Sequence, residues 1–302
     1  RPLSSHEFVD LGRSGGPRVP STAHSTLPPR GCTMSAMLKK RYGPWVDQGP
    51  TSSIDHAVRM RVLAIPQAGM GAWAFHGWQA ALPETVELLP VELPGRNSRM
   101  LEPKGQSMRQ LVTALVDALA ETLRETPFVV FGHSLGAWMA YEVCVELQKR
   151  GGPTPVGLVV SGARAPQLAD PKNDADRVQP RMADLPSRAF WAHFERRYGA
   201  NPDLAHVAVK EHVEPLLKAD FRLFETYQPR LAVLPYAVVA CAAVGDDRVL
   251  DSQLEAWRER CGGGFAMQRF DATWPPWATP HRWPVDDPIA FLAWFGPWLC
   301  SH

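Results

Sequence analysis

The segment Gly132-His133-Ser134-Leu135-Gly136 has the residues of a serine nucleophile held in a tight turn. The apolar run 128–131 comes directly before it, and a segment with helical spacing of apolar residues follows it: Met139, Val143 and Leu147. A strand that enters a helix through such a turn lifts the Ser134 hydroxyl above the sheet, and glycine at both ends avoids collisions with neighbouring backbone. The Leu135 N–H then lies at a helix N-terminus, where it can stabilise an oxyanion. The predicted chemistry is nucleophilic catalysis by Ser134.

A serine nucleophile needs a base that takes its proton and an acid that orients the base. In the α/β-hydrolase fold these residues follow the serine in the order acid, then histidine. His281 follows the last predicted strand, and we predict that it is the base. Asp246 and Asp247 both follow the preceding strand, and Asp247 is the favoured acid. His133 is expected to pack beside the turn rather than to act as the base.

The glycine-containing loop 66–73 follows the first predicted strand and is expected to supply a second oxyanion donor. The backbone amide of Gln67 or of Ala68 is the candidate. A plain turn is the alternative interpretation of this loop, and only the Ser134 motif argues against it.

The elements that must position these residues alternate between strand and helix. Strands are predicted at 58–65, 86–93, 128–131, 156–161, 236–244 and 265–270, and helices at 187–198, 211–227, 254–260 and 288–299, with another that starts after Ser107. Continuous apolar strands without alternation favour a mostly parallel sheet with helices on both faces, which is an α/β fold. The helical segment 167–230 interrupts the alternation and is predicted to be an inserted lid over Ser134, with a separate surface subdomain as the alternative.

The 302 residues suffice for one large α/β domain, and the 45% of hydrophobic residues suits a globular core. A net charge of +1 gives no electrostatic case for nucleic acid, and no apolar run is long enough to span a membrane. The five cysteines have no paired spacing, so we expect a reduced, cytoplasmic protein without a metal site. Residues 1–55 are predicted to be a disordered leader before a domain at 56–302. Plastid or mitochondrial location is expected if this leader is a transit peptide, and an artificial leader is an equal alternative.

Several further motifs are similar to those of the type II thioesterases, stand-alone α/β-hydrolases that act on carrier proteins of polyketide, nonribosomal peptide and fatty-acid synthesis. Their residues span most of the chain: Ile65-Pro66-Gln67-Ala68-Gly69, Val91-Glu92-Leu93-Pro94-Gly95-Arg96, Phe131 to Ala137, Ser161 to Pro166, Leu216 to Arg222 with Glu225 and Tyr227, and Asp246-Asp247 with Trp257. The Gly-x-Ser-x-Gly motif alone indicates only the superfamily. The Pro-Gly-Arg loop and the Ala-Asp-Phe-Arg segment are more specific.

This resemblance implies that the protein hydrolyses acyl thioesters on the phosphopantetheine arm of an acyl or peptidyl carrier protein. It implies Ser134 as nucleophile, Asp247 as acid and the amides of Ala68 and Leu135 as oxyanion donors, with no cofactor beyond the partner's own arm. We also expect a monomer. A carboxylesterase or lipase of the same fold and a catalytically impaired carrier-binding homologue are the alternatives.

The sequence departs from the family pattern in two places. Met70 replaces a small residue beside the oxyanion loop. Residues 271–280 intervene between the last strand and His281, where the family has its base almost directly after the strand. If this insertion moves His281 away from Ser134, the enzyme would be slow or inactive.

Overall fold

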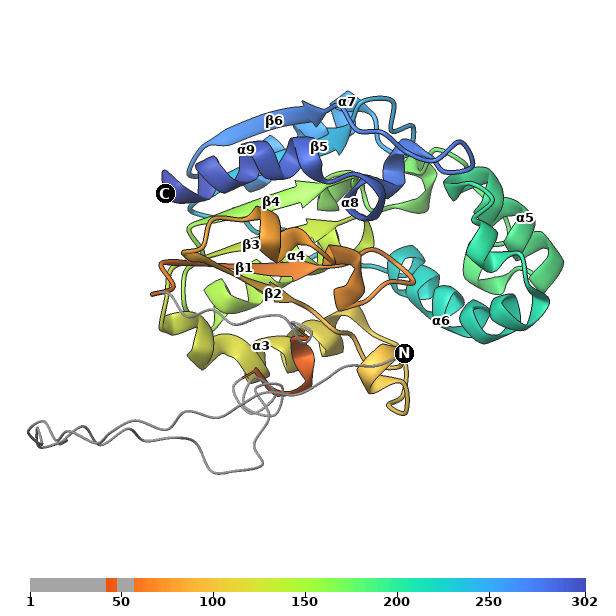
Figure 1. Cartoon of the computed structure of the whole chain (residues 1–302), viewed down its shortest axis with the longest axis horizontal. Coiled ribbons are helices and arrows are strands. Elements are labelled where there is room, and N and C mark those ends of the chain that lie inside the picture. Colours follow the sequence, from red (N-terminus) through yellow and green to blue (C-terminus); the bar gives the residue numbers. More distant parts are fainter. Residues whose placement is uncertain (1–41, 48–56) are drawn as a thin grey trace, which may run out of the picture. The chain divides into compact units, whose positions relative to one another are not determined.

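The computed structural model describes residues 42–47 and 57–302, and all structural statements concern these residues. Six strands form one parallel sheet in the order β2-β1-β3-β4-β5-β6 (Figure 1). The strands are β1 (Met60–Ile65), β2 (Val86–Pro90), β3 (Phe128–His133), β4 (Gly157–Ser161), β5 (Ala237–Ala243) and β6 (Phe265–Phe270). The predicted α/β class and parallel sheet are confirmed.

The α-helices are α2 (Trp78–Ala81), α3 (Met108–Arg124), α4 (Leu135–Lys149), α5 (Ser187–Tyr198), α6 (Val207–Glu225), α7 (Asp251–Glu255), α8 (Trp283–Asp286) and α9 (Ile289–Cys300). Short 3-10 helices are η1 (Gly43–Trp45), η2 (Ala72–Phe75), η3 (Asn97–Arg99), η4 (Pro166–Leu168), η5 (Pro171–Asn173), η6 (Met182–Asp184), η7 (Pro202–Leu204), η8 (Ala256–Arg260) and η9 (Pro280–Arg282). Within the described part of the chain, no helix has both the length and the apolar character needed to cross a bilayer.

Every residue of β1 to β4 is buried, whereas the edge strand β6 is mostly exposed or half-buried. Successive strand residues point to opposite faces of the sheet, so both faces of the central strands are covered. In β1, Leu63 and Ile65 pack in a core with α3 and α4, whereas Val62 and Ala64 pack in a second core with α2, α8 and α9. Burial on both sides explains why the strands are continuously apolar in sequence. Parallel strands also bring their carboxyl ends to one edge, and the loops that leave this edge carry the candidate site residues.

The segment between β4 and β5 is helical, as predicted, and we call residues 167–230 the lid segment. Helices α5 and α6 lie beyond the carboxyl edge of the sheet (Figure 1). They share a small core of their own that includes Phe190, Trp191 and Phe221. The lid segment therefore has its own apolar packing.

The predicted leader is wrong for residues 42–47. The side chains of Tyr42, Trp45 and Val46 are buried in the core beside α3, and Val46 forms a β-bridge with Val91. The Tyr42 hydroxyl also donates a hydrogen bond to Glu87. These buried aromatic contacts hold residues 42–47 in place. The Pro/Ser/Gly-rich composition around them gave no sign of this packing. The rest of the predicted leader lies outside the described residues.

Candidate active site

Ser134 lies between β3 and α4 in a strained turn, with φ 54° and ψ −118°. A positive φ is unfavourable for a residue with a side chain, so this conformation requires support from its surroundings. The two glycines of the motif provide that support by close contact. A Cβ on Gly132 would lie 2.1 Å from the Gly136 carbonyl oxygen, and a Cβ on Gly136 would lie 2.2 Å from the Ile65 carbonyl oxygen. The predicted turn, and the predicted reason for its glycines, are confirmed.

His281 lies in η9, and its side chain is buried at the carboxyl edge of the sheet. Its ring Nδ1 is 2.9 Å from Oδ2 of Asp246, and the other carboxylate oxygen of Asp246 accepts a hydrogen bond from the Arg248 amide at 3.0 Å. Burial alone would raise the pKa of the Asp246 carboxyl, but the His281 ring and the Arg248 amide outweigh burial and hold that pKa below its usual value. Asp246 is therefore an anionic partner for the imidazole.

The expectation that Asp247 orients the histidine is wrong, since the structure places Asp246 there. The turn after β5, in which the Asp246 amide donates to the Ala243 carbonyl, directs the Asp246 side chain inward. Asp246 is 4% exposed, whereas Asp247 is on the surface. Consecutive residues in this turn thus face opposite environments.

Ser134 and His281 line the same cavity, which has a volume of about 140 Å³. The lid segment supplies most of the apolar wall: Phe194, Tyr198, Leu204, Val213, Leu217 and Phe221. Within the described residues, the Ser134 hydroxyl makes no hydrogen bond to another protein group. Catalytic hydrogen bonds are often long in the absence of substrate, so a shared cavity is the relevant geometry.

Of the two predicted oxyanion donors, Ala68 lines this cavity, and Leu135 directly follows Ser134 in the chain. Leu135 is the first residue of α4, so its amide has no acceptor within the helix. Ala68 lines the cavity, and hydrogen bonds to the next two residues hold its loop in place. The Gly69 amide donates to Asp220 at 2.7 Å, and Arg96 donates to the Met70 carbonyl at 2.8 Å.

His133 connects the nucleophile turn to the base-bearing loop. Its Nε2 is 2.8 Å from the His281 carbonyl oxygen, which only accepts, so this nitrogen carries the proton. Its Nδ1 therefore accepts from the Ser161 hydroxyl at 3.0 Å. Burial, together with the nearby His281 ring, lowers the pKa of His133 to about 3. His133 is thus a neutral packing residue, as predicted, and it also holds the main chain of His281.

The loop that precedes His281 contacts the lid segment. Gly199, just after α5, forms an antiparallel bridge with Ala278, and the Tyr198 ring lies 5.6 Å from the His281 ring. Gly199 has φ +85°, and a Cβ there would lie 1.8 Å from the Trp277 carbonyl oxygen. The extra residues before His281 thus have a defined contact, and His281 reaches the cavity despite them.

Comparisons with known proteins identify the family of this chain. Residues 60–276 match the family model of the thioesterase domain. The chain belongs to the thioesterase family. It is 34% identical to thioesterase PikA5 of Streptomyces venezuelae over 70% of this chain and 73% of that protein, and 29% identical to gramicidin S biosynthesis protein GrsT of Aneurinibacillus migulanus over 72% and 82%. The solved structure of the RedJ thioesterase from the prodiginine pathway of Streptomyces coelicolor has a TM-score of 0.67 and 31% identity, covering 80% of this chain and 86% of that one.

The protein is a type II thioesterase, a thioester hydrolase of the α/β-hydrolase fold. The matched range includes Ser134 and Asp246 but ends before His281.

The structure also explains the more specific thioesterase motifs. Arg96 of the Pro-Gly-Arg loop forms a bidentate, buried ion pair with Asp220 on α6. Glu225 accepts hydrogen bonds from the amides of Met182 and Ala183, and the Tyr227 hydroxyl donates to Glu142 on α4. Asp220 and Tyr227 thus join the lid segment to the Pro-Gly-Arg loop and to α4, and Glu225 joins two parts of the lid segment to each other.

Within residues 42–47 and 57–302, no cluster of three or more His, Cys, Asp or Glu side chains is arranged to hold a metal ion. Sequence reasoning favoured Asp247 over Asp246, and it missed the Tyr198 contact and the link from His133 to His281. Of these features, only the acid gave a signal in the sequence, because the adjacent Asp246 and Asp247 were the two candidates for it.

Proposed function

We propose that this thioesterase hydrolyses acyl thioesters carried on the phosphopantetheine arm of an acyl or peptidyl carrier protein, with Ser134, His281 and Asp246 as a catalytic triad. The observation that carries the proposal is that Ser134 and the His281–Asp246 pair meet at one cavity with apolar lid walls. The relative named for gramicidin S biosynthesis and the RedJ thioesterase from the prodiginine biosynthetic pathway support the choice of carrier-bound substrates.

The proposed reaction begins when His281 Nε2 takes the Ser134 proton and the serine oxygen attacks the thioester carbonyl. Asp246, bound to Nδ1, fixes the ring and stabilises the imidazolium. The amides of Ala68 and Leu135 stabilise the tetrahedral oxyanion. The pantetheine thiol leaves with the proton from His281, and an acyl-enzyme remains. Water then attacks the acyl-enzyme, again with His281 as base, and releases the free acid. In this proposal the protein needs no cofactor or metal of its own.

The test compares the wild type with Ser134→Ala on an acyl carrier protein thioester, on the matching acyl-N-acetylcysteamine and on a p-nitrophenyl ester. We expect the highest kcat/KM on the carrier-bound thioester, and no acyl-enzyme with Ser134→Ala although the variant folds. Faster turnover of the oxygen ester than of either thioester would favour a carboxylesterase. Wild-type rates from Ser134→Ala would refute the nucleophile assignment, and failure of Ser134 to react with a fluorophosphonate would favour a non-catalytic homologue.

A further inference from the structure

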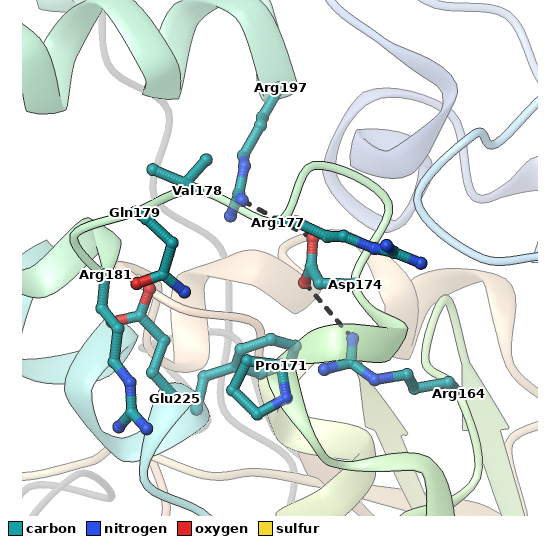
Figure 2. A pocket seen from close by; sticks show the side chains of 10 residues that line it. Arg164, Pro171, Asp174, Arg177, Val178, Gln179, Arg181, Arg197 and Glu225 are labelled. Atoms are coloured by element: carbon teal, nitrogen blue, oxygen red, sulfur yellow. Dashed lines mark hydrogen bonds and ion pairs between the residues drawn. The ribbon is translucent and has the colours of Figure 1, made fainter.

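A cluster of arginine and aspartate side chains joins the lid segment to the loop that carries Asp246. Asp174 and Asp176 belong to the part of the lid segment between η5 and α5. Asp174 accepts from Arg164 after β4 at 3.3 Å and pairs with Arg197 on α5 at 3.5 Å (Figure 2). Asp176 accepts from Arg197 at 2.5 Å.

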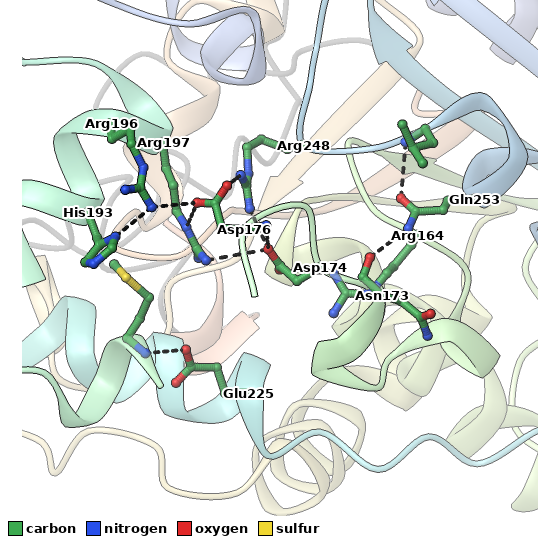
Figure 3. A network of polar contacts seen from close by, with 12 residues as sticks. Arg164, Asn173, Asp174, Asp176, His193, Arg196, Arg197, Glu225, Arg248 and Gln253 are labelled. Carbon is green, nitrogen blue, oxygen red and sulfur yellow. Dashed lines mark hydrogen bonds and ion pairs between the residues drawn. The ribbon is translucent and has the colours of Figure 1, made fainter. Parts of the chain in front are cut away.

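Arg248 brings the acid-bearing loop into this cluster. Its guanidinium donates to Asp174 at 2.7 Å and to Asp176 at 3.0 Å (Figure 3). Its side chain is only 9% exposed, so solvent screens these contacts little. The same residue donates its backbone amide to Asp246 at 3.0 Å. Arg248 thus binds the lid segment through its side chain and Asp246 through its backbone amide.

We infer that Arg248 is a positioning residue for Asp246, anchored by Asp174 and Asp176 of the lid segment. Asp246 is buried and contacts His281 through one oxygen, so the other oxygen depends on the Arg248 amide for its place. A fork of two charge-assisted hydrogen bonds fixes an arginine more firmly than one contact would. The lid segment therefore supports the acid as well as covering the cavity. This inference rests on the proposed triad.

The cluster has more arginines than aspartates, so we expect the protein to fold when Arg248 is replaced. Four arginines (Arg164, Arg196, Arg197 and Arg248) face two aspartates, so Arg248→Gln leaves three arginines with two aspartates. Arg230→Gln is the matched control, because Arg230 also bridges two carboxylates, Glu142 and Glu146, away from Asp246.

The experiment measures kcat and KM for acyl-thioester hydrolysis, normalised to the fraction of protein that a fluorophosphonate labels at Ser134. We expect Arg248→Gln to lower kcat by about 10- to 100-fold, the scale of a small misplacement of a catalytic group, with little change in KM. Asp176→Asn should lower kcat in the same way. The double variant should be no worse than Arg248→Gln alone, because both act through one contact. Arg230→Gln should retain the wild-type kcat.

Two results would overturn the inference: an unchanged normalised kcat for Arg248→Gln, or additive losses in the double variant. Its failure is separable from that of the proposed function. If the wild type hydrolyses thioesters and Ser134→Ala does not, the triad nucleophile stands whatever Arg248 does.

Discussion

At the scale of single residues, the two buried histidines differ in what their ring nitrogens contact. Both ring nitrogens of His133 are hydrogen-bonded, one to Ser161 and one to the His281 carbonyl. His281 uses Nδ1 for Asp246, and in the proposed mechanism its Nε2 exchanges a proton at the cavity. The chemistry of each histidine therefore follows from its hydrogen bonds rather than from its distance in sequence to Ser134.

The aspartate assignment leads to a paired prediction. Asp246→Asn should lower kcat by on the order of 10³- to 10⁴-fold, because a neutral amide neither fixes the required tautomer nor stabilises the imidazolium. Asp247→Asn should leave kcat near the wild-type value, since that side chain is on the surface. Steady-state kinetics of both variants on one acyl thioester, with thermal unfolding as the folding control, tests this. A larger loss in Asp247→Asn would reverse the assignment.

His133 predicts a pH dependence of stability. An unfolded histidine takes up a proton below pH ~6.5, whereas burial holds the pKa of folded His133 at about 3. The unfolded state thus binds the extra proton, and the free energy of unfolding should fall on acidification from pH ~6.5 towards 3. The slope contributed is about 1.4 kcal/mol per pH unit. His133→Gln, which keeps a donor and an acceptor, should have a shallower slope in urea unfolding at pH 7, 6 and 5. Equal slopes would contradict this origin.

The sequence was sufficient to predict the positions of Ser134 and His281 in the fold, but not which aspartate contacts His281. The nucleophile could be predicted because strand, glycine-bounded turn and helix are all local patterns. Asp246 and Asp247 could not be separated, because a single residue step through a turn moves a side chain from the interior to the surface. That outcome depends on the hydrogen bond from the Asp246 amide to Ala243, which no local pattern indicates.

At the scale of elements, apolar periodicity predicted most strands and helices, and α5 has the predicted bounds. The predicted helix 254–260 instead divides into α7 and η8, and α6 begins at Val207 rather than at residue 211. Contacts between elements were beyond prediction. Arg248 meets Asp174 and Asp176 over more than 70 positions in sequence, and polar side chains leave no periodic signal of such pairing.

The bridge between α5 and the base-bearing loop predicts a strong effect of a small substitution. Gly199→Ala should lower kcat, because the added Cβ would meet the Trp277 carbonyl at 1.8 Å and push away the loop that carries His281. Gly77→Ala is the control, since Gly77 has a similar φ of +80° but open space around its Cβ position. Kinetics and melting temperatures of both variants separate loop displacement from backbone strain. Equal kcat values for the two variants would argue against the bridge.

At the scale of the whole molecule, the lid segment contacts each loop that carries a site residue. Asp220 binds the oxyanion loop at Gly69, the arginine–aspartate cluster binds the acid-bearing loop, and Gly199 binds the base-bearing loop. The lid was predicted because helical segments interrupt the alternation of strands and helices in this part of the sequence. The attachment of the lid segment to these loops could not be inferred from the sequence, because it depends on how the lid segment packs against the carboxyl edge of the sheet.

The buried pair of Arg96 and Asp220 allows stability and activity to be separated. Asp220→Leu removes the counter-ion of a buried arginine and should cost about 3–5 kcal/mol of unfolding free energy. Adding Arg96→Met should recover much of that loss, because paired apolar residues often replace a buried ion pair without penalty. The double variant still lacks the acceptor for the Gly69 amide, so its kcat should remain low.

The control for this experiment is the buried pair of Arg61 and Glu87, which lies at the opposite edge of the sheet. Arg61→Met combined with Glu87→Leu also removes a buried ion pair, but it touches no loop of the cavity, so kcat per folded molecule should be unchanged. Denaturant unfolding gives the stabilities, and acyl-thioester kinetics give kcat. If Arg96→Met/Asp220→Leu regains both stability and kcat, the pair only stabilises the fold. If it regains stability alone, the lid segment holds the oxyanion loop in its active position.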